Sequence, residues 1–255
     1  MSSTTLHSFI EKQGFRRHIP YYLMEGFGLA IFMVSASYFT TVMESPSSPV
    51  HHAIPNGQLR LLIIAVAMGL TAYVIFNSPW TAPSGAHINP AVTLARLRLG
   101  QIRKIDAFFY MVAQCAGGLL GVYGMALALG PAFREPPVNY VVTVPGKNYS
   151  SWQAAACELL IAFIMFTMIL FSSRSERWQK YTKELAALLV SCFVFVSGPI
   201  SGFGMNPARS LASALPSGIW TSIAIYMICP ILGMLAATEL FLFVTKGEQE
   251  RTVLK

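Results

Sequence analysis

Six apolar runs, each long enough to cross a lipid bilayer, dominate this chain of 255 residues. A transmembrane helix needs about 20 consecutive, mostly apolar residues to cross the hydrocarbon layer. We place the six runs near residues 20–43, 59–77, 104–129, 152–173, 184–203 and 218–245. Only 11% of the residues are charged, against about 25% in an ordinary soluble domain. The chain is therefore predicted to be an all-α integral membrane protein.

The Lys and Arg residues predict how these spans are oriented. Most of them precede the first span, precede the third, join the fourth to the fifth, or follow the sixth. An even-span count puts all four regions on one side, and basic loops favour the cytoplasmic side. We therefore expect a multi-pass protein of the cell membrane, with the termini 1–18 and 247–255 both cytoplasmic. Topology accounts for the net charge of +7, so no nucleic-acid partner is expected.

The chain contains an internal repeat. SGAHINPAVTLA, residues 84–95, and SGFGMNPARSLA, residues 201–212, are identical at seven of twelve positions. One copy follows the second span and the other follows the fifth. Three spans per half is an odd number, so the second half must be inserted upside down. We expect one membrane domain over residues 1–255, with inverted halves of about 18–130 and 150–246.

Each copy of the repeat is predicted to begin a short helix. Asn is a strong N-cap, and Pro is favoured at the first helical position. AVTLARLRL and ARSLASAL are too short to span, so each half-helix would begin near the midplane, where irregular backbone must be buried or line a water-filled cavity. Two positive helix ends at one point would pass neutral molecules and exclude protons. The residues expected at this point are Asn89, Pro90, Ala91, Asn206, Pro207 and Ala208.

With paired Asn-Pro-Ala motifs in an inverted repeat, the chain resembles the major intrinsic protein family, the aquaporins and glycerol facilitators. The resemblance covers nearly the whole chain. It implies six transmembrane helices and two re-entrant half-helices in a right-handed bundle. It also implies a pore in each subunit of a homotetramer, passive flow of water or small uncharged solutes, and no metal or cofactor.

The resemblance also assigns roles to four polar residues. Glu25 in the first span and Glu158 in the fourth match buried glutamates that hold the re-entrant loops by hydrogen bonds. A carboxylate inside a span is costly, which independently indicates a supporting or functional role. His87 matches a loop histidine that is usually structural, and Gln114 matches a glutamine of the third span.

One charged residue distinguishes the two motifs. Arg209 directly follows the second motif, where the first has Val92. A charged side chain at this depth is expected to face water or a pore. Matching to the family implies a selectivity filter formed by Met68, Val194, Phe203 and Arg209.

The filter residues match no single branch of the family. Val194 stands where strict water channels have a histidine, and Phe203 resembles the glycerol-facilitator pattern. Facilitators usually have Asp after the arginine, whereas this chain has Ser210. We expect a water channel that also passes small neutral solutes such as glycerol, urea, ammonia or hydrogen peroxide.

Other functions are compatible with parts of this pattern. One is a glycerol-type facilitator with water as a secondary solute, and another is a closed membrane protein used for structure or adhesion. Active transport usually needs coupling-ion groups, of which the spans offer almost none besides Glu25 and Glu158. The sequence contains no nucleophile–base pair at a spacing that would indicate an enzyme. Asn148 begins a glycosylation sequon in the predicted outer loop, whose use depends on the host.

Overall fold

The structure is a computed structural model that describes residues 3–253, with side chains described for residues 16–246. Parts of the predicted charged termini therefore lie outside the described residues, including the side chains of Lys12, Arg251 and Lys255. Within the described range the chain is helical and contains no strand.

Six long helices confirm the predicted spans. Their bounds are α1 Ser3–Glu44, α3 Gly57–Asn77, α5 Lys104–Leu129, α7 Ser151–Arg174, α8 Thr182–Ser201 and α10 Ile223–Val253. Each contains a segment long and apolar enough to cross a membrane. The two predicted half-helices are also present, as α4 Pro90–Arg98 and α9 Pro207–Ser217.

Two span boundaries differ from the sequence prediction because the chain turns earlier or later than its hydropathy suggests. Helix α8 ends at Ser201, since Gly202 adopts a left-handed φ of 78°, so Phe203 lies in a loop rather than in the span. Helix α10 begins at Ile223 rather than near residue 218. Gly218 ends α9 with a φ of 68°, and the residues between the two helices form a turn.

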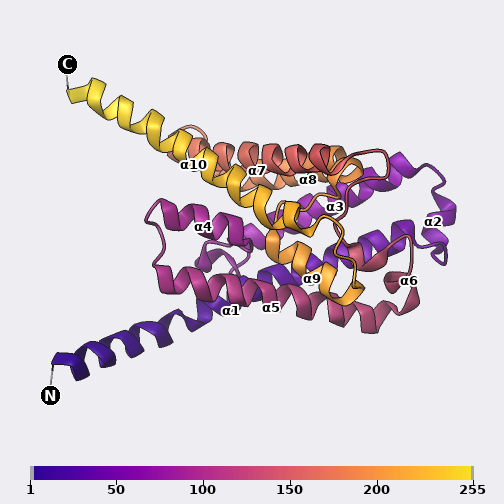
Figure 1. Ribbon diagram of the computed structural model, residues 1–255, viewed down its shortest axis with the longest axis horizontal. Coiled ribbons are helices and arrows are strands. Elements are labelled where there is room, and N and C mark those ends of the chain that lie inside the picture. Colours follow the sequence, from indigo (N-terminus) through magenta and orange to yellow (C-terminus); the bar gives the residue numbers. More distant parts are fainter. Residues whose placement is uncertain (1–2, 254–255) are drawn as a thin grey trace.

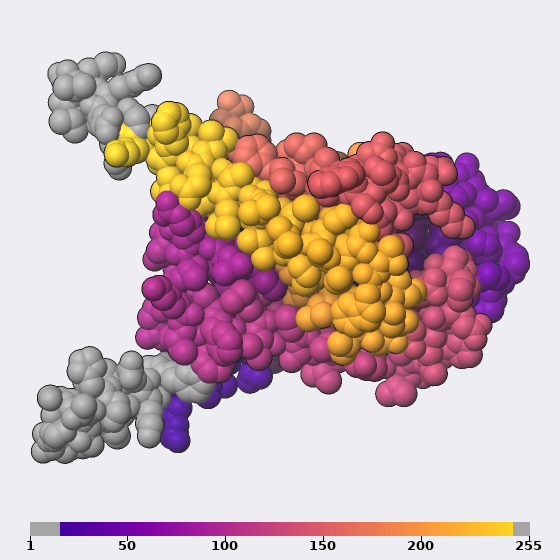
Figure 2. All heavy atoms as spheres, in the orientation of Figure 1, coloured from indigo at the N-terminus to yellow at the C-terminus, as the bar shows by residue number. Residues whose placement is uncertain are grey.

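Both termini lie at one end of the bundle, which we call the terminal end (Figure 1). The short helices α2 Pro49–Ala53 and α6 Pro131–Arg134 lie at the opposite, distal end. Helix α1 packs along α5, and α10 packs along α7, while α3 packs against α8. Figure 2 shows α10 lying across one face of the bundle, where it also contacts α4 and α9.

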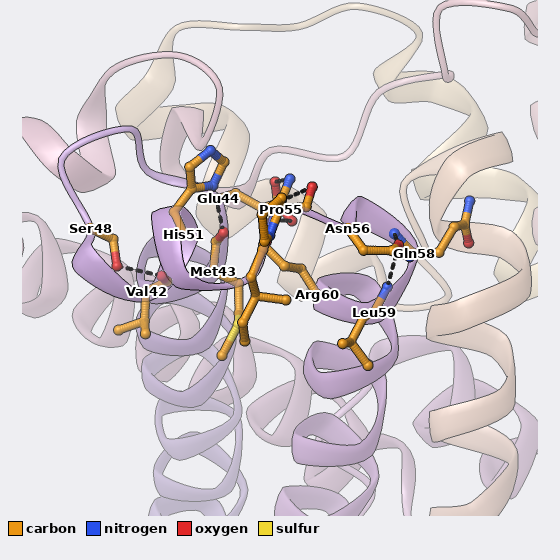
Figure 3. Close-up of polar contacts among 11 residues, drawn as sticks. Val42, Met43, Glu44, Ser48, His51, Pro55, Asn56, Gln58, Leu59 and Arg60 are labelled. Carbon is orange, nitrogen blue, oxygen red and sulfur yellow. Dashed lines mark hydrogen bonds and ion pairs between the residues drawn. The ribbon is translucent and has the colours of Figure 1, made fainter.

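A salt bridge fixes the distal connection between α1 and α3 (Figure 3). The Arg60 guanidinium bonds both carboxylate oxygens of Glu44, at 3.1 Å each. Its Nη1 also donates to the carbonyl oxygens of Ile54 and Pro55. Asn56 caps α3 through its side-chain oxygen. The guanidinium of Arg60 thus stabilises the connection between α1 and α3.

Helices α1 and α5 approach so closely that glycine is needed where they cross. A Cβ placed on Gly117 would lie 1.9 Å from the carbonyl oxygen of Gly26. A Cβ placed on Gly124, seven residues further along α5, would meet nothing within 4 Å. Only the first of these glycines is required by packing.

We expect Gly117→Ala to destabilise the protein by roughly 1–3 kcal/mol or more, because the helices must separate to admit a methyl group. Gly124→Ala is the matched control and should be neutral or stabilising by up to about 1 kcal/mol, since Ala is the better helix former. Thermal unfolding in detergent measures both. Equal melting temperatures for the two variants would contradict the close helix crossing.

Candidate functional site

The two loops that precede the half-helices share an unusual backbone. Ala86 and Ile88 have left-handed φ values of 47° and 42° in the first loop. Phe203 and Met205 have values of 51° and 47° at the corresponding places of the second. Residues with a side chain rarely adopt this conformation, which costs roughly 1–2 kcal/mol each. Surrounding contacts must therefore hold both loops in place.

Glu25 holds the first loop. Its side chain is 0% exposed. Its Oε1 accepts hydrogen bonds from Ser84 Oγ at 2.6 Å and the His87 backbone N–H at 2.9 Å. Its Oε2 accepts from the Ile88 backbone N–H at 2.5 Å and from Gln114 Nε2 at 2.8 Å. Four donors thus replace the water that burial removes from this carboxyl group.

Glu158 holds the second loop through matching contacts. It is also 0% exposed. Its Oε1 accepts from Ser201 Oγ at 2.6 Å and the Gly204 backbone N–H at 2.8 Å, and its Oε2 accepts from the Met205 backbone N–H at 2.5 Å. Each glutamate thus binds one serine and two consecutive backbone N–H groups of its loop. These are loop-holding hydrogen bonds of the kind that the resemblance implies.

Two buried tyrosines complete the support, and sequence reasoning did not predict this role. Tyr110 of α5 donates to the Ser84 carbonyl at 2.9 Å, and Tyr226 of α10 donates to the Ser201 carbonyl at 2.7 Å. The tyrosines occupy corresponding places in the third span of each half. Their matching positions in the two halves of the repeat were the sequence signal that could have predicted this supporting role.

The predicted N-caps are confirmed. The Asn89 side-chain oxygen accepts from the Ala91 N–H at 2.9 Å, at the start of α4. The Asn206 oxygen accepts from the N–H groups of Ala208, at 3.0 Å, and Arg209, at 3.3 Å, at the start of α9. Because the oxygens face their own helices, the amide nitrogens point away from them.

The asparagines also join the two loops to each other. Asn89 Nδ2 donates to the Met205 carbonyl at 2.8 Å, and Asn206 Nδ2 donates to the Ile88 carbonyl at 2.7 Å. These reciprocal bonds bring the positive N-termini of both half-helices together at the centre of the bundle. An amide group carries two N–H bonds, so each asparagine retains one for a passing molecule.

A cavity of about 650 Å³ leads to this meeting point, and both asparagines line it. It extends from the α7–α8 connection at the terminal end to the level of Phe203. Apolar side chains from five long helices form most of the remaining wall. These are Phe32, Ala72, Phe76, Met165, Ile169, Ala186, Val190 and Met234.

Two predicted filter residues continue this wall beyond the cavity. Met68 lies one helical turn from Ala72 on α3, and Val194 lies one turn from Val190 on α8, so each shares a helix face with a cavity-lining residue. Both are buried. Neither is among the residues that line the cavity, whereas the third predicted filter residue, Phe203, is.

Arg209 lies in the first turn of α9 and is only 7% exposed. Its Nη1 donates to the Val141 carbonyl at 2.8 Å, in the 3₁₀ turn η2 (Asn139–Val141). Within the described part of the chain, no carboxylate lies within 4 Å of it. The other guanidinium nitrogens of Arg209 do not appear among the described side-chain atoms that are both buried and without a hydrogen-bond partner. We infer that they are solvent-accessible and can donate hydrogen bonds to a molecule beside them.

His87 and Gln114 meet at one hydroxyl group. Thr93 Oγ1 lies 3.2 Å from His87 Nδ1 and accepts from Gln114 Nε2 at 3.1 Å. The same hydroxyl donates to the Asn89 carbonyl at 3.1 Å. Because that donation uses the hydroxyl proton, His87 Nδ1 is the donor to Thr93, and the ring has a fixed orientation beside the cavity.

Comparison with known proteins identifies the architecture. The sequence profile of the family described as "Major intrinsic protein" matches residues 21–241. The chain belongs to the major intrinsic protein family. Members of this family are passive membrane channels and not enzymes.

Its relatives include aquaporins and another major intrinsic protein. Aquaporin NIP1-1 of Zea mays is 34% identical over 210 residues, covering 79% of this chain and 70% of the relative. The lens fiber major intrinsic protein of Homo sapiens is 33% identical over 182 residues, covering 69% and 66%. A probable NIP-type aquaporin of Nicotiana alata is 34% identical over 160 residues. That match spans 62% of this chain but only 57% of the relative.

The fold also matches a solved structure, the aquaglyceroporin from Plasmodium falciparum. The TM-score is 0.74 over 88% of this chain and 95% of that one. Sequence identity is only 18%, so this likeness concerns the fold alone.

We expect Glu158→Gln to destabilise the protein and lower its water permeability. The amide nitrogen would face backbone donors that now bind a carboxylate, leaving a buried N–H unpaired at a cost of about 1–3 kcal/mol. Glu239→Gln is the matched control, because Glu239 forms an exposed ion pair with Arg98, which is worth at most about 1 kcal/mol. Thermal unfolding and stopped-flow light scattering measure both effects. An equal response from the two variants would contradict the loop-holding role of Glu158.

Proposed function

We propose that this protein is a passive channel for water that also passes small uncharged solutes and excludes protons and ions. The observation that carries the proposal is the reciprocal bonding of Asn89 and Asn206 at the end of a cavity. Two half-helix N-termini meet there, and each contributes about half a positive charge. A cation, including hydronium, is repelled at this point, while a neutral molecule meets free amide donors.

We propose that Met68, Val194, Phe203 and Arg209 form the selectivity filter at the distal end of the pore. Support comes from the shared helix faces of Met68 and Val194, from the place of Phe203 in the cavity lining and from the available donors of Arg209. The arginine can bind a hydroxyl or carbonyl oxygen. The apolar side chains accommodate a carbon backbone, and Val194 offers no hydrogen-bond donor.

A glycerol-type facilitator, with water as a secondary solute, is the second candidate. Phe203 favours it, because an aromatic wall suits the carbon backbone of a polyol. Relatives include NIP-type aquaporins, and the fold resembles an aquaglyceroporin. The ratio of glycerol flux to water flux distinguishes the two candidates.

We also propose a homotetramer in the cell membrane, with both termini cytoplasmic. The orientation rests on the basic residues near the terminal end. The tetramer rests on the family resemblance and on an apolar groove of about 740 Å³ between α1 and α3. That groove offers a neighbouring subunit a surface on which to pack within the lipid bilayer.

We expect Arg209→Val to raise proton and cation leakage relative to water flow, because the filter loses its fixed positive charge. Arg134→Val is the matched control at the distal end, since Arg134 bonds the Ala126 carbonyl and does not line the cavity. Proteoliposomes that contain a pH-sensitive dye measure the leak. If Arg209→Val leaks no more than the control, Arg209 does not belong to the filter.

We expect Val194→His to reduce glycerol flux more than water flux, because an imidazole narrows the filter and adds a polar group. Val194→Thr is the control of similar volume and should change the flux ratio far less. Stopped-flow light scattering with glycerol and with an impermeant osmolyte gives both rates. An unchanged ratio in Val194→His would place Val194 outside the filter.

A further inference from the structure

The terminal end of the cavity is positively charged. Arg96, near the end of α4, lines it together with Lys180 of the 3₁₀ turn η3 (Gln179–Tyr181) and Lys183 in the first turn of α8. Glu184 is the acidic residue in the lining. We call Arg96, Lys180 and Lys183 the vestibule cations. They come from both halves of the chain and line one cavity.

The vestibule cations have no acidic partner. Among the described residues, no carboxylate oxygen lies within 4 Å of any of them. Arg96 donates to Gln101 Oε1 at 2.6 Å, and its guanidinium carbon lies 5.7 Å from the Phe166 ring centre. The Lys180 ammonium lies 4.8 Å from the Tyr181 ring centre. None of the three cations forms an ion pair, and Glu184 is the one acidic residue among the described residues that line the cavity with them.

Two other basic residues near this end form ion pairs, unlike the vestibule cations. Arg98 lies 2.7 Å from a Glu239 carboxylate oxygen, and Arg103 lies 2.6 Å from an Asp106 oxygen. Neither arginine lines the cavity. Ion pairing thus neutralises these two arginines outside the cavity, whereas the three vestibule cations that line it form no ion pair.

A neutral solute needs no cluster of cations, but an anion does. Clefts lined by one sign of charge concentrate ions of the opposite sign. Arg and Lys bind phosphate oxygens through strong charge-assisted hydrogen bonds. The lining also supplies Ser173, Gln179 and Thr182, whose hydroxyl and amide groups can donate to the same oxygens.

We propose that this vestibule binds soluble, phosphate-bearing anions, and that a bound anion blocks the pore from the terminal end. A soluble source is favoured over a lipid headgroup because the cations line the cavity itself. The same cavity continues to Asn89 and Asn206, so an anion held at its opening stands on the solute path. The blocking step rests on the proposed channel function, whereas binding can be tested without it.

Binding is measured on the purified full chain in detergent, with inorganic triphosphate as the probe, by isothermal titration calorimetry at fixed ionic strength. The double variant Lys180→Gln/Lys183→Gln should bind triphosphate about tenfold more weakly, as expected for the loss of two exposed ion pairs. Lys104→Gln/Arg177→Gln is the matched control. It removes the same charge near the same end of the bundle, from residues that do not line the cavity.

The expected result is wild-type affinity in the control and weakened affinity in the vestibule variant. An absence of binding to the wild type, or equal weakening in both variants, would overturn the site. Circular dichroism and size-exclusion profiles show whether each variant is folded. The single variant Lys183→Gln, expected to have an intermediate affinity, provides a second test if the double variant is unstable.

Blocking is measured in proteoliposomes by stopped-flow light scattering, with triphosphate on both sides and each protein compared with its own rate without triphosphate. Triphosphate should slow water flow through the wild type and the control variant, and slow the vestibule variant far less. Binding without any slowing would overturn the blocking step alone. If water flow is slower in proteoliposomes whose membrane is rich in phosphoinositide, and triphosphate does not slow it, the proposed soluble source of the anion is wrong. A wild type that conducts no water at all would refute the channel proposal and leave the binding result standing.

Discussion

Two buried carboxyl groups hold the centre of this protein together. Glu25 and Glu158 each bind one serine hydroxyl and two consecutive backbone N–H groups of a loop. Those loops contain left-handed residues that an isolated chain would rarely adopt. The loops in turn place Asn89 and Asn206 so that each donates to the opposite loop. Without the glutamates, each loop would lose three of the hydrogen bonds that offset its backbone strain.

The two halves share this support but differ around it. The first half adds Gln114 and Thr93, which bind one another and the Glu25 carboxylate or the Asn89 carbonyl. In the second half, Arg209 follows the motif and bonds the Val141 carbonyl of a distal loop. The scaffold is therefore symmetric while the pore is not. Three cations line the cavity at its terminal end, and Phe203 lines it beyond the two asparagines.

Much of the fold followed from the sequence, because local rules decided it. Hydrophobic run length predicted the six spans, and Asn-Pro chemistry predicted where α4 and α9 begin. The turn before α10 was not predicted, since hydropathy does not detect the turn conformations of Gly218 and Ser222. For the same reason, the fifth span was extended through Phe203.

Long-range contacts in the candidate site were harder to predict. The motif repeat indicated the glutamate positions, but nothing in the sequence showed that the asparagine amides bond the opposite loop. The roles of Tyr110 and Tyr226 depend on helix packing. In the sequence, the vestibule cations served only to predict the orientation of the spans. The fold is what places Arg96, Lys180 and Lys183 in the lining of one cavity. The filter assignment of Met68 remains a prediction based on a shared helix face.

The most direct test of the channel is the osmotic response of proteoliposomes that contain the unmodified protein. An impermeant osmolyte should cause shrinkage many times faster than in empty liposomes, with a weak temperature dependence, because water crosses a preformed pore. Glycerol should then cause rapid re-swelling if the filter admits small solutes. Shrinkage no faster than in empty liposomes, with the protein shown to be folded, would contradict the account and favour a closed structural role.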